Sequence, residues 1–289
     1  MTMEAGESRE TSERPARTRA LALAAWELEQ TRKTRPDSPR ARAILLRAHQ
    51  KLQAELEERQ GVPPEQRSVI LARPDARDSV LLIHGASGTP AELRPLAERL
   101  HADGFNVYCP LLPGYAKIRT GLGDVLWRGS LQEIRLRFRL LRQVSRRVHV
   151  VGLSFGAALA IHLARGEQPS SLVLLSPALV PRLPLGVRIL LRLGLQRLHA
   201  VRRRYGWSLQ ILEAMERARP LVAHVESPVY AAHCADDAMI SPQSLRLIQK
   251  KSRHSASRFR LYPDGGHTIL AAHGETSLYG EIAQFLREC

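Results

Sequence analysis

The sequence predicts an α/β fold with a doubly wound, mostly parallel sheet. From about residue 68 onward, short β-branched runs alternate with helical stretches, the order expected when helices cover both faces of a parallel sheet. Residues 79–83 are too uniformly apolar for a half-exposed strand and are typical of a central one. The pentapeptide Gly152-Leu153-Ser154-Phe155-Gly156 follows the apolar residues 148–151 and precedes a helix-forming stretch. This pattern predicts a strand, a tight turn and a helix.

Residues 1–66 predict a helical extension that precedes the sheet domain. Residues 1–19 are polar and are predicted to be disordered. Residues 20–28 favour a helix, and residues 40–59 place their apolar side chains on one helical face. A linker containing proline and glycine then separates this extension from a main domain over residues 67–289. The two helices could dock on the main domain, form a homodimer or lie on a membrane surface; docking or dimerisation is favoured.

The main domain is predicted to contain seven strands and one long helical insertion. Between residues 175 and 228 no segment resembles a strand, and this is far longer than a usual connection in such a fold. The insertion, at about residues 178–226, mixes leucines with arginines and is a candidate lid over the site. Strands are predicted at residues 68–71, 79–83, 106–109, 148–151, 171–175, 228–232 and 258–262, and helices at residues 91–102, 131–144, 157–164, 242–251 and 274–287.

The 289-residue chain has a formal net charge of +15, and most of the excess lies in its middle. Residues 115–205 contain 17 Lys and Arg against 3 Asp and Glu, which predicts one positive face and not a nonspecific affinity for nucleic acid. The alternation of Leu and Arg over residues 183–204 is typical of an amphipathic helix whose arginines could contact an anionic membrane surface. The blander interpretation is that these arginines serve solubility alone.

The remaining composition favours a cytoplasmic protein without a cofactor, peripheral to a membrane if the basic face binds lipid. No apolar run approaches the roughly 20 residues that span a bilayer, and the polar start does not resemble a signal peptide. The three cysteines, Cys109, Cys234 and Cys289, are far apart, so neither a disulfide framework nor a zinc site is predicted. No metal is expected.

The pentapeptide around Ser154 fits Gly-x-Ser-x-Gly, a sharp turn that lifts a serine hydroxyl above the end of a parallel sheet. Both flanking positions must be small so that strand and helix can approach closely, and Gly152 and Gly156 meet this requirement. The following helix would point its positive N-terminus at the serine. Because Gly and Ser are common, this pentapeptide is a weak signal unless partners for the serine are found.

Partners for Ser154 follow in the order that acyl-transfer chemistry needs. A base must accept the hydroxyl proton, an acid must orient the base, and backbone donors must hold the oxyanion. Asp236 and Asp237 follow the predicted strand 228–232, and His267 follows the predicted strand 258–262. Upstream, the strand ending at residue 83 leads into His84-Gly85-Ala86. This turn offers the Ala86 N–H as a partner for the N–H of Phe155.

Taken together, these segments resemble the α/β-hydrolase family, in particular its small carboxylesterase and monoacylglycerol-lipase-like branch. The resemblance covers about residues 68–288 and implies an α/β-hydrolase fold with Ser154 as nucleophile, Asp237 as acid and His267 as base. It also implies Ala86 and Phe155 as oxyanion donors, although family members often carry a bulky residue in place of Ala86. The matching runs are Leu82-Ile83-His84-Gly85-Ala86-Ser87-Gly88-Thr89-Pro90, Pro110-Leu111-Leu112-Pro113-Gly114-Tyr115, Gly152-Leu153-Ser154-Phe155-Gly156, Asp237-Ala238-Met239-Ile240-Ser241-Pro242 and Gly266-His267-Thr268.

Several neighbouring residues compete for these roles. Asp236 is the rival acid, but the spacing to the run at residues 239–242 favours Asp237. Asp264 is expected to cap a turn, and His273, the rival base, lies in or beside the last helix. His84 is interpreted as a structural residue that holds the oxyanion turn through a hydrogen bond.

The resulting functional prediction is a serine carboxylic ester hydrolase that cleaves a monoacyl or small lipid-like ester through an acyl-enzyme. An acyltransferase, a thioesterase or an amidase could use the same residues. A different class of function is a catalytically idle hydrolase fold that binds anionic membrane or nucleic acid. A serine in the turn argues against dehalogenase or epoxide-hydrolase chemistry, because those enzymes use an aspartate nucleophile.

Overall fold

The computed structural model describes residues 39–115, 127–184, 186, 187, 189, 193 and 199–289. The helix expected at residues 20–28 and the polar start before it lie outside the described residues. So does part of the basic run expected at residues 183–204, including the side chains of its triple-arginine segment.

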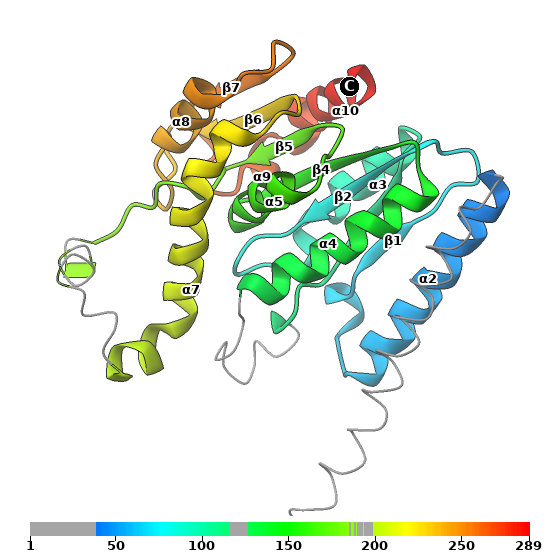
Figure 1. The fold of residues 1–289 in the computed structure, drawn as a ribbon, viewed down its shortest axis with the longest axis horizontal. Coiled ribbons are helices and arrows are strands. Elements are labelled where there is room, and N and C mark those ends of the chain that lie inside the picture. Colours follow the sequence, from blue (N-terminus) through cyan, green and yellow to red (C-terminus); the bar gives the residue numbers. More distant parts are fainter. Residues whose placement is uncertain (1–38, 116–126, 185, 188, 190–192, 194–198) are drawn as a thin grey trace, which may run out of the picture.

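Within the described residues, the strands form one seven-stranded sheet in the order β1-β3-β2-β4-β5-β6-β7 (Figure 1). Only β1 and β3 pair in antiparallel fashion, and every other neighbouring pair is parallel. The predicted mostly parallel sheet is therefore confirmed. The strands are β1 (Val69–Leu71), β2 (Asp78–Ile83), β3 (Asn106–Cys109), β4 (Arg147–Leu153), β5 (Leu172–Leu175), β6 (Val229–Cys234) and β7 (Arg258–Tyr262).

Helices cover both faces of the sheet (Figure 1). Alternate residues of β2 show the two layers: Val80 and Leu82 pack with α3 and α10, whereas Leu81 and Ile83 pack with α4 and α5. This alternation explains why the central strands are apolar throughout, since both faces are buried. The helices named here are α3 (Arg94–Ala102), α4 (Trp127–Val144), α5 (Phe155–Gly166), α8 (Gln243–Lys251) and α10 (Tyr279–Glu288), and a short 3₁₀ helix, η2 (Pro90–Leu93), precedes α3.

The prediction of a single helix over residues 274–287 is wrong. The chain instead forms α9 (Ile269–His273), a π-helical segment, η6 (Gly274–Leu278), and then α10. The Tyr279 ring packs directly on Gly274, where an added Cβ would lie 2.5 Å from the ring. This close approach accommodates the wider π turn at the junction.

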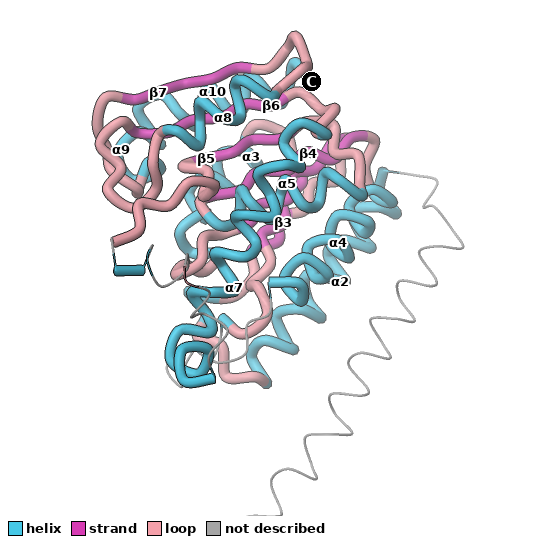
Figure 2. Tube along the Cα trace, turned by 60° about the vertical axis from the view of Figure 1, so that its left-hand side comes forward, coloured by secondary structure: helices cyan, strands magenta, loops and turns pink. Residues whose placement is uncertain are grey.

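The N-terminal helix α2 (Pro39–Arg59) packs against α4 and β1, and Figure 2 shows it running alongside α4. Leu46 of this helix is buried and belongs to the hydrophobic core. Glu57, also buried, accepts hydrogen bonds from the backbone N–H and the hydroxyl of Ser68 at 2.9 and 2.5 Å. His49 Nε2 lies 3.0 Å from both Tyr108 Oη and Arg137 Nη1. Of the three predicted uses of this helix, the structure shows docking on the main domain.

The segment between β5 and β6 contains α7 (His199–Leu221) and η5 (Val222–His224). Near its beginning, Pro181 forms an isolated antiparallel bridge with Ile240, which lies in the turn after β6. The adjoining bonds run from Arg182 N–H to Met239 O and from Ser241 N–H to Val180 O, at 2.9 and 2.8 Å. The start of the insertion is thus joined to a turn at the carboxyl edge of the sheet.

Candidate active site

The turn between β4 and α5 holds Ser154 in a strained backbone conformation. Its φ of 55° and ψ of −115° lie outside the regions that most residues with a side chain adopt. The two flanking glycines leave no room for a larger residue. A Cβ on Gly156 would overlap Ile83 O and lie 2.7 Å from His84 O, and one on Gly152 would lie 2.6 Å from Ala157 Cα. These contacts confirm the predicted need for small residues on both sides of the serine.

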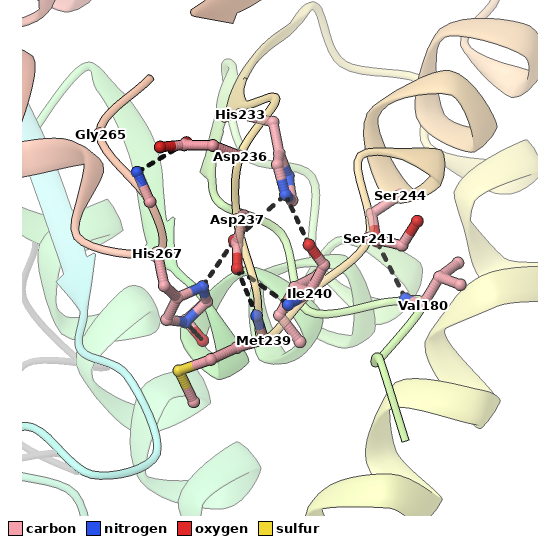
Figure 3. Close-up of polar contacts among 12 residues, drawn as sticks. Val180, His233, Asp236, Asp237, Met239, Ile240, Ser241, Ser244, Gly265 and His267 are labelled. Atoms are coloured by element: carbon pink, nitrogen blue, oxygen red, sulfur yellow. Dashed lines mark hydrogen bonds and ion pairs between the residues drawn. The ribbon is translucent and has the colours of Figure 1, made fainter. Parts of the chain in front are cut away.

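Three side chains from separate turns form a continuous hydrogen-bonded row. Ser154 Oγ lies 2.8 Å from His267 Nε2, and His267 Nδ1 lies 2.8 Å from Asp237 Oδ2. Because the carboxylate can only accept, Nδ1 carries the proton and Nε2 is left to accept the serine hydroxyl. The turns after β4, β6 and β7 supply the three residues at one edge of the sheet. Figure 3 shows the His267 ring directed at Asp237.

Asp237 is fully buried, and both of its carboxylate oxygens are bonded. The backbone N–H groups of Met239 and Ile240 donate to Oδ1 at 2.8 and 2.9 Å, and Oδ2 faces both His267 and His233 (Figure 3). Burial alone would raise the pKa of Asp237. Hydrogen bonds from His233, His267 and the Ile240 amide instead hold that pKa well below its usual range. The carboxylate therefore stays ionised whenever the protein is folded and near neutral pH.

The rival residues occupy other positions. Asp236 is exposed and accepts a hydrogen bond from Gly266 N–H at 2.8 Å, which braces the loop that carries His267 (Figure 3). His273 donates to Asp264 O at 2.7 Å and stacks on the Tyr262 ring. Neither Asp236 nor His273 belongs to the hydrogen-bonded row that ends at Ser154.

The turn after β2 lies beside the serine turn, because Ile83 pairs with Gly152 across the two parallel strands. Within the described part of the chain, neither the Ala86 N–H nor the Phe155 N–H donates a hydrogen bond. Two free donors beside a nucleophile are what an oxyanion hole requires. The structure therefore leaves both predicted donors available.

His84 holds the turn after β2 through side-chain hydrogen bonds, as predicted. It is fully buried, its Nδ1–H donates to Gly85 O at 2.9 Å, and its Nε2 accepts from Leu112 N–H at 3.1 Å. Gly85 O belongs to the same peptide group as Ala86 N–H, so this bond fixes the direction of that donor. Burial lowers the pKa of His84 to about 4, although the bond to Gly85 O acts in the opposite direction. The imidazole is neutral at neutral pH.

Glu92 and His233 are two site residues that the sequence did not reveal. Glu92, in η2, accepts the Gly85 N–H at 2.5 Å, and its carboxylate lies against Gly88, where any Cβ would overlap it. His233 contacts Asp237 from the end of β6. Both residues act over contacts between turns, so no local pattern identifies them. The only available signal was the position of Glu92 in the first turn of a helix.

Some of the excess arginines in the middle of the chain form ion pairs with glutamates. Arg128 pairs with Glu213, and Arg139 pairs with Glu167, at 2.8 and 2.7 Å.

Among the described helices, none is long and apolar enough to cross a membrane. The described residues also contain no group of three or more His, Cys, Asp and Glu side chains placed to hold a metal ion.

The model of the alpha/beta hydrolase family matches residues 80–276, which is more than half of the chain. The chain belongs to this family.

Relatives within the family include lipases and esterases. A 90-residue segment is 38% identical to a thermostable monoacylglycerol lipase of Bacillus sp. (strain H-257), but the match spans only 34% of that relative and 29% of this chain. Among solved structures, one from a study of the metagenome-derived lipolytic enzymes LipS and LipT has a TM-score of 0.65 at 18% identity, covering 78% of this chain and 99% of that one. A Paleococcus ferrophilus monoacylglycerol lipase has a TM-score of 0.60 at 19% identity, covering 76% and 97%. At these identities the structures show a shared fold.

Proposed function

We propose that the protein is a serine hydrolase that cleaves carboxylic esters through an acyl-enzyme on Ser154. The observation that carries this proposal is the hydrogen-bonded row from Ser154 through His267 to Asp237, with both links at 2.8 Å. Such a row places a base on the hydroxyl and a buried anion behind the base. It would have no evident purpose in a fold that served binding alone.

In the proposed reaction, Ser154 Oγ attacks the acyl carbon while its proton passes to His267 Nε2. The N–H groups of Ala86 and Phe155 stabilise the oxyanion of the tetrahedral intermediate. His267 then gives the proton to the departing alcohol, and the acyl group stays on the serine. Water attacks the acyl group next and gives a proton to His267, which passes it to Ser154 Oγ as the acid is released. Asp237 remains ionised throughout and holds the imidazole in the required tautomer.

An exposed apolar side chain beside the site supports an acyl substrate of lipid type. Met239, two residues after Asp237, is 60% exposed beside His267 (Figure 3). Exposed apolar side chains near a catalytic centre suit a hydrocarbon chain better than a charged substrate. The short match to a monoacylglycerol lipase points to the same substrate class.

The same three residues would also serve an acyltransferase, a thioesterase or an amidase, because each of them forms an acyl-enzyme. These activities differ in the leaving group and in the acceptor that removes the acyl group. Product analysis in the presence of a competing alcohol separates hydrolysis from transfer. Ester hydrolysis is the reaction that we propose.

A series of p-nitrophenyl esters with increasing acyl length tests the proposal. We expect turnover by the wild-type protein, with a preference for chains longer than acetyl. Ser154→Ala should lower kcat by about 10⁴-fold or more, because the nucleophile is lost. Turnover that peaks at acetyl would count against the lipid-like substrate.

Ser176→Ala is the matched control. Ser176 follows β5, is buried, and also has a positive φ, of 42°, but its hydroxyl has no hydrogen-bond partner among the described residues. Its variant should retain activity within about threefold, since the removed hydroxyl makes no bond. If Ser154→Ala were as active as Ser176→Ala, the proposed mechanism would be wrong.

A further inference from the structure

His233 is a second imidazole on the proposed catalytic carboxylate. It lies in β6, four residues before Asp237, and its side chain is fully buried. Its Nε2 is 3.2 Å from Asp237 Oδ2 and 3.2 Å from Ile240 O (Figure 3). Oδ2 therefore faces two imidazoles, one from His233 and one from His267.

The surroundings of the ring determine where its proton lies. Both groups that face His233 Nε2 are acceptors, so this nitrogen must carry the proton. Nδ1 is buried and has no hydrogen-bond partner among the described residues. A proton on Nδ1 would leave a buried donor without a partner. It would also place the lone pair of Nε2 next to two acceptor oxygens, and both arrangements are unfavourable in a low dielectric. The Nε2–H tautomer avoids both penalties.

This contact completes the set of donors around Asp237. Two backbone N–H groups hold Oδ1, and two imidazoles hold Oδ2. The carboxylate cannot rotate without breaking several bonds. Because His233 takes up part of the charge on Oδ2, less of that charge acts on His267.

We propose that His233 is a positioning residue, which orients Asp237 and weakens the hold of that carboxylate on the protonated form of His267. This inference rests on the proposed function, since it assigns Asp237 and His267 to the reaction. Among the described residues, the side chain of His233 contacts Asp237 and Ile240 and forms no bond with Ser154.

Other charged groups near this pair stay in place when His233 is changed. Asp236 is bonded to Gly266 N–H, and Glu92, in η2, lies within electrostatic range of His267. Asp264 pairs with His273. A change in the behaviour of His267 on substitution of His233 would therefore arise through Asp237.

The first test uses the wild-type protein. A long-range ¹H–¹⁵N correlation spectrum distinguishes the two neutral tautomers of each histidine. We expect the Nε2–H tautomer for His233. The Nδ1–H tautomer would overturn the inference, because that form cannot donate to Asp237.

The second test is the pH profile of kcat/KM for a p-nitrophenyl ester. In His233→Leu, the acid limb of this pH profile should move to higher pH by about 0.5 to 1 unit. The reason is that the whole charge of Asp237 then acts on His267 and favours its protonated form. The kcat should also fall by about tenfold as the carboxylate loses one restraint. His233→Gln should restore both values toward wild type, since its amide nitrogen lies the same number of bonds from the backbone as Nε2.

His149→Leu is the matched control. His149 is another fully buried histidine in the sheet, on β4, and its Nε2 has no partner among the described residues. Its variant removes a buried imidazole of the same size without touching Asp237, so the acid limb should stay where it is. If His233→Leu kept the wild-type acid limb and kcat, the inference would fail while the proposed function stood. A wild-type protein without ester turnover would instead overturn the proposed function.

Discussion

The serine turn after β4 and the acid turn after β6 hold their functional residues in different ways. The serine turn is shaped by close packing: Gly152 and Gly156 leave no space for a Cβ, and the backbone of Ser154 is strained. The acid turn is shaped by hydrogen bonds, four of which converge on the carboxylate of Asp237. The first turn therefore tolerates no added atom, and the second tolerates no lost polar atom.

Asp237→Asn should give the largest effect, because it changes the polar chemistry of the acid turn while preserving its shape. An amide in place of the carboxylate favours the wrong tautomer of His267. We expect kcat/KM for an ester to fall by about 10³- to 10⁴-fold. Thermal unfolding of the purified variant would show that the protein is still folded.

Asp236→Asn is the control for this change on the neighbouring residue. Its side chain is exposed, and an amide oxygen can still accept the Gly266 N–H. Activity should fall by no more than about tenfold. Equal losses in the two variants would contradict the assignment of Asp237.

Gly156→Ala should disrupt the serine turn by adding a single methyl group. The new Cβ would overlap Ile83 O and approach His84 O to 2.7 Å, both of which are backbone atoms in the sheet and the oxyanion turn. We expect a loss of about 3 kcal/mol or more in the free energy of unfolding, measured by urea denaturation.

Gly166→Ala, at the other end of α5, is the matched control for this substitution. Its Cβ would meet only the end of Arg135, at 3.5 Å, an ordinary contact. Since alanine also favours a helix, this variant should be as stable as wild type or slightly more so. A similar loss of stability at both positions would show that close packing is not special to the turn.

Acidification should affect two buried histidines and Asp237 at different pH values. Burial lowers the pKa of His84 and of His149 to about 4. Between about pH 6.5 and 4, these histidines are therefore protonated in the unfolded chain and neutral in the folded one. The free energy of unfolding should fall as the pH drops through this window, by up to about 1.4 kcal/mol per pH unit for each histidine. The ionised Asp237, whose pKa is depressed, contributes stability that is lost only below about pH 4.

Urea unfolding at pH 7, 5.5 and 4.5 measures this dependence. In His149→Phe, the free energy of unfolding should decrease less steeply with falling pH, because the contribution of one histidine is lost. An unfolding free energy that stays constant from pH 7 to 4.5 would contradict the neutral, buried state of these imidazoles.

Much of the fold and several site residues could be predicted from the sequence, because their signals are local. The pattern of strands and helices, the two glycines around Ser154 and the succession of turns all follow from short segments. The preference for Asp237 over Asp236 came from its spacing to the run at residues 239–242, and the structure gives the reason: Asp237 accepts the N–H groups of Met239 and Ile240.

The remaining features depend on contacts between segments. The π segment before α10 arises where Tyr279 packs on Gly274, and a helical pattern does not show this packing. The roles of Glu92 and His233 require the turns after β2 and β6 to be in place, and a single glutamate or histidine has no pattern of its own. The sequence therefore predicts the proposed reacting groups better than the residues that hold them.

The most direct test of the proposed nucleophile is to locate the adduct of a fluorophosphonate probe. The probe phosphonylates an activated serine and displaces fluoride, and peptide mass spectrometry identifies the modified residue. We expect one adduct, on Ser154, formed by the wild-type protein and by Ser176→Ala, and none on Ser154→Ala. No adduct on the wild-type protein, or an adduct that persists in Ser154→Ala, would contradict the assignment of Ser154 as the catalytic nucleophile.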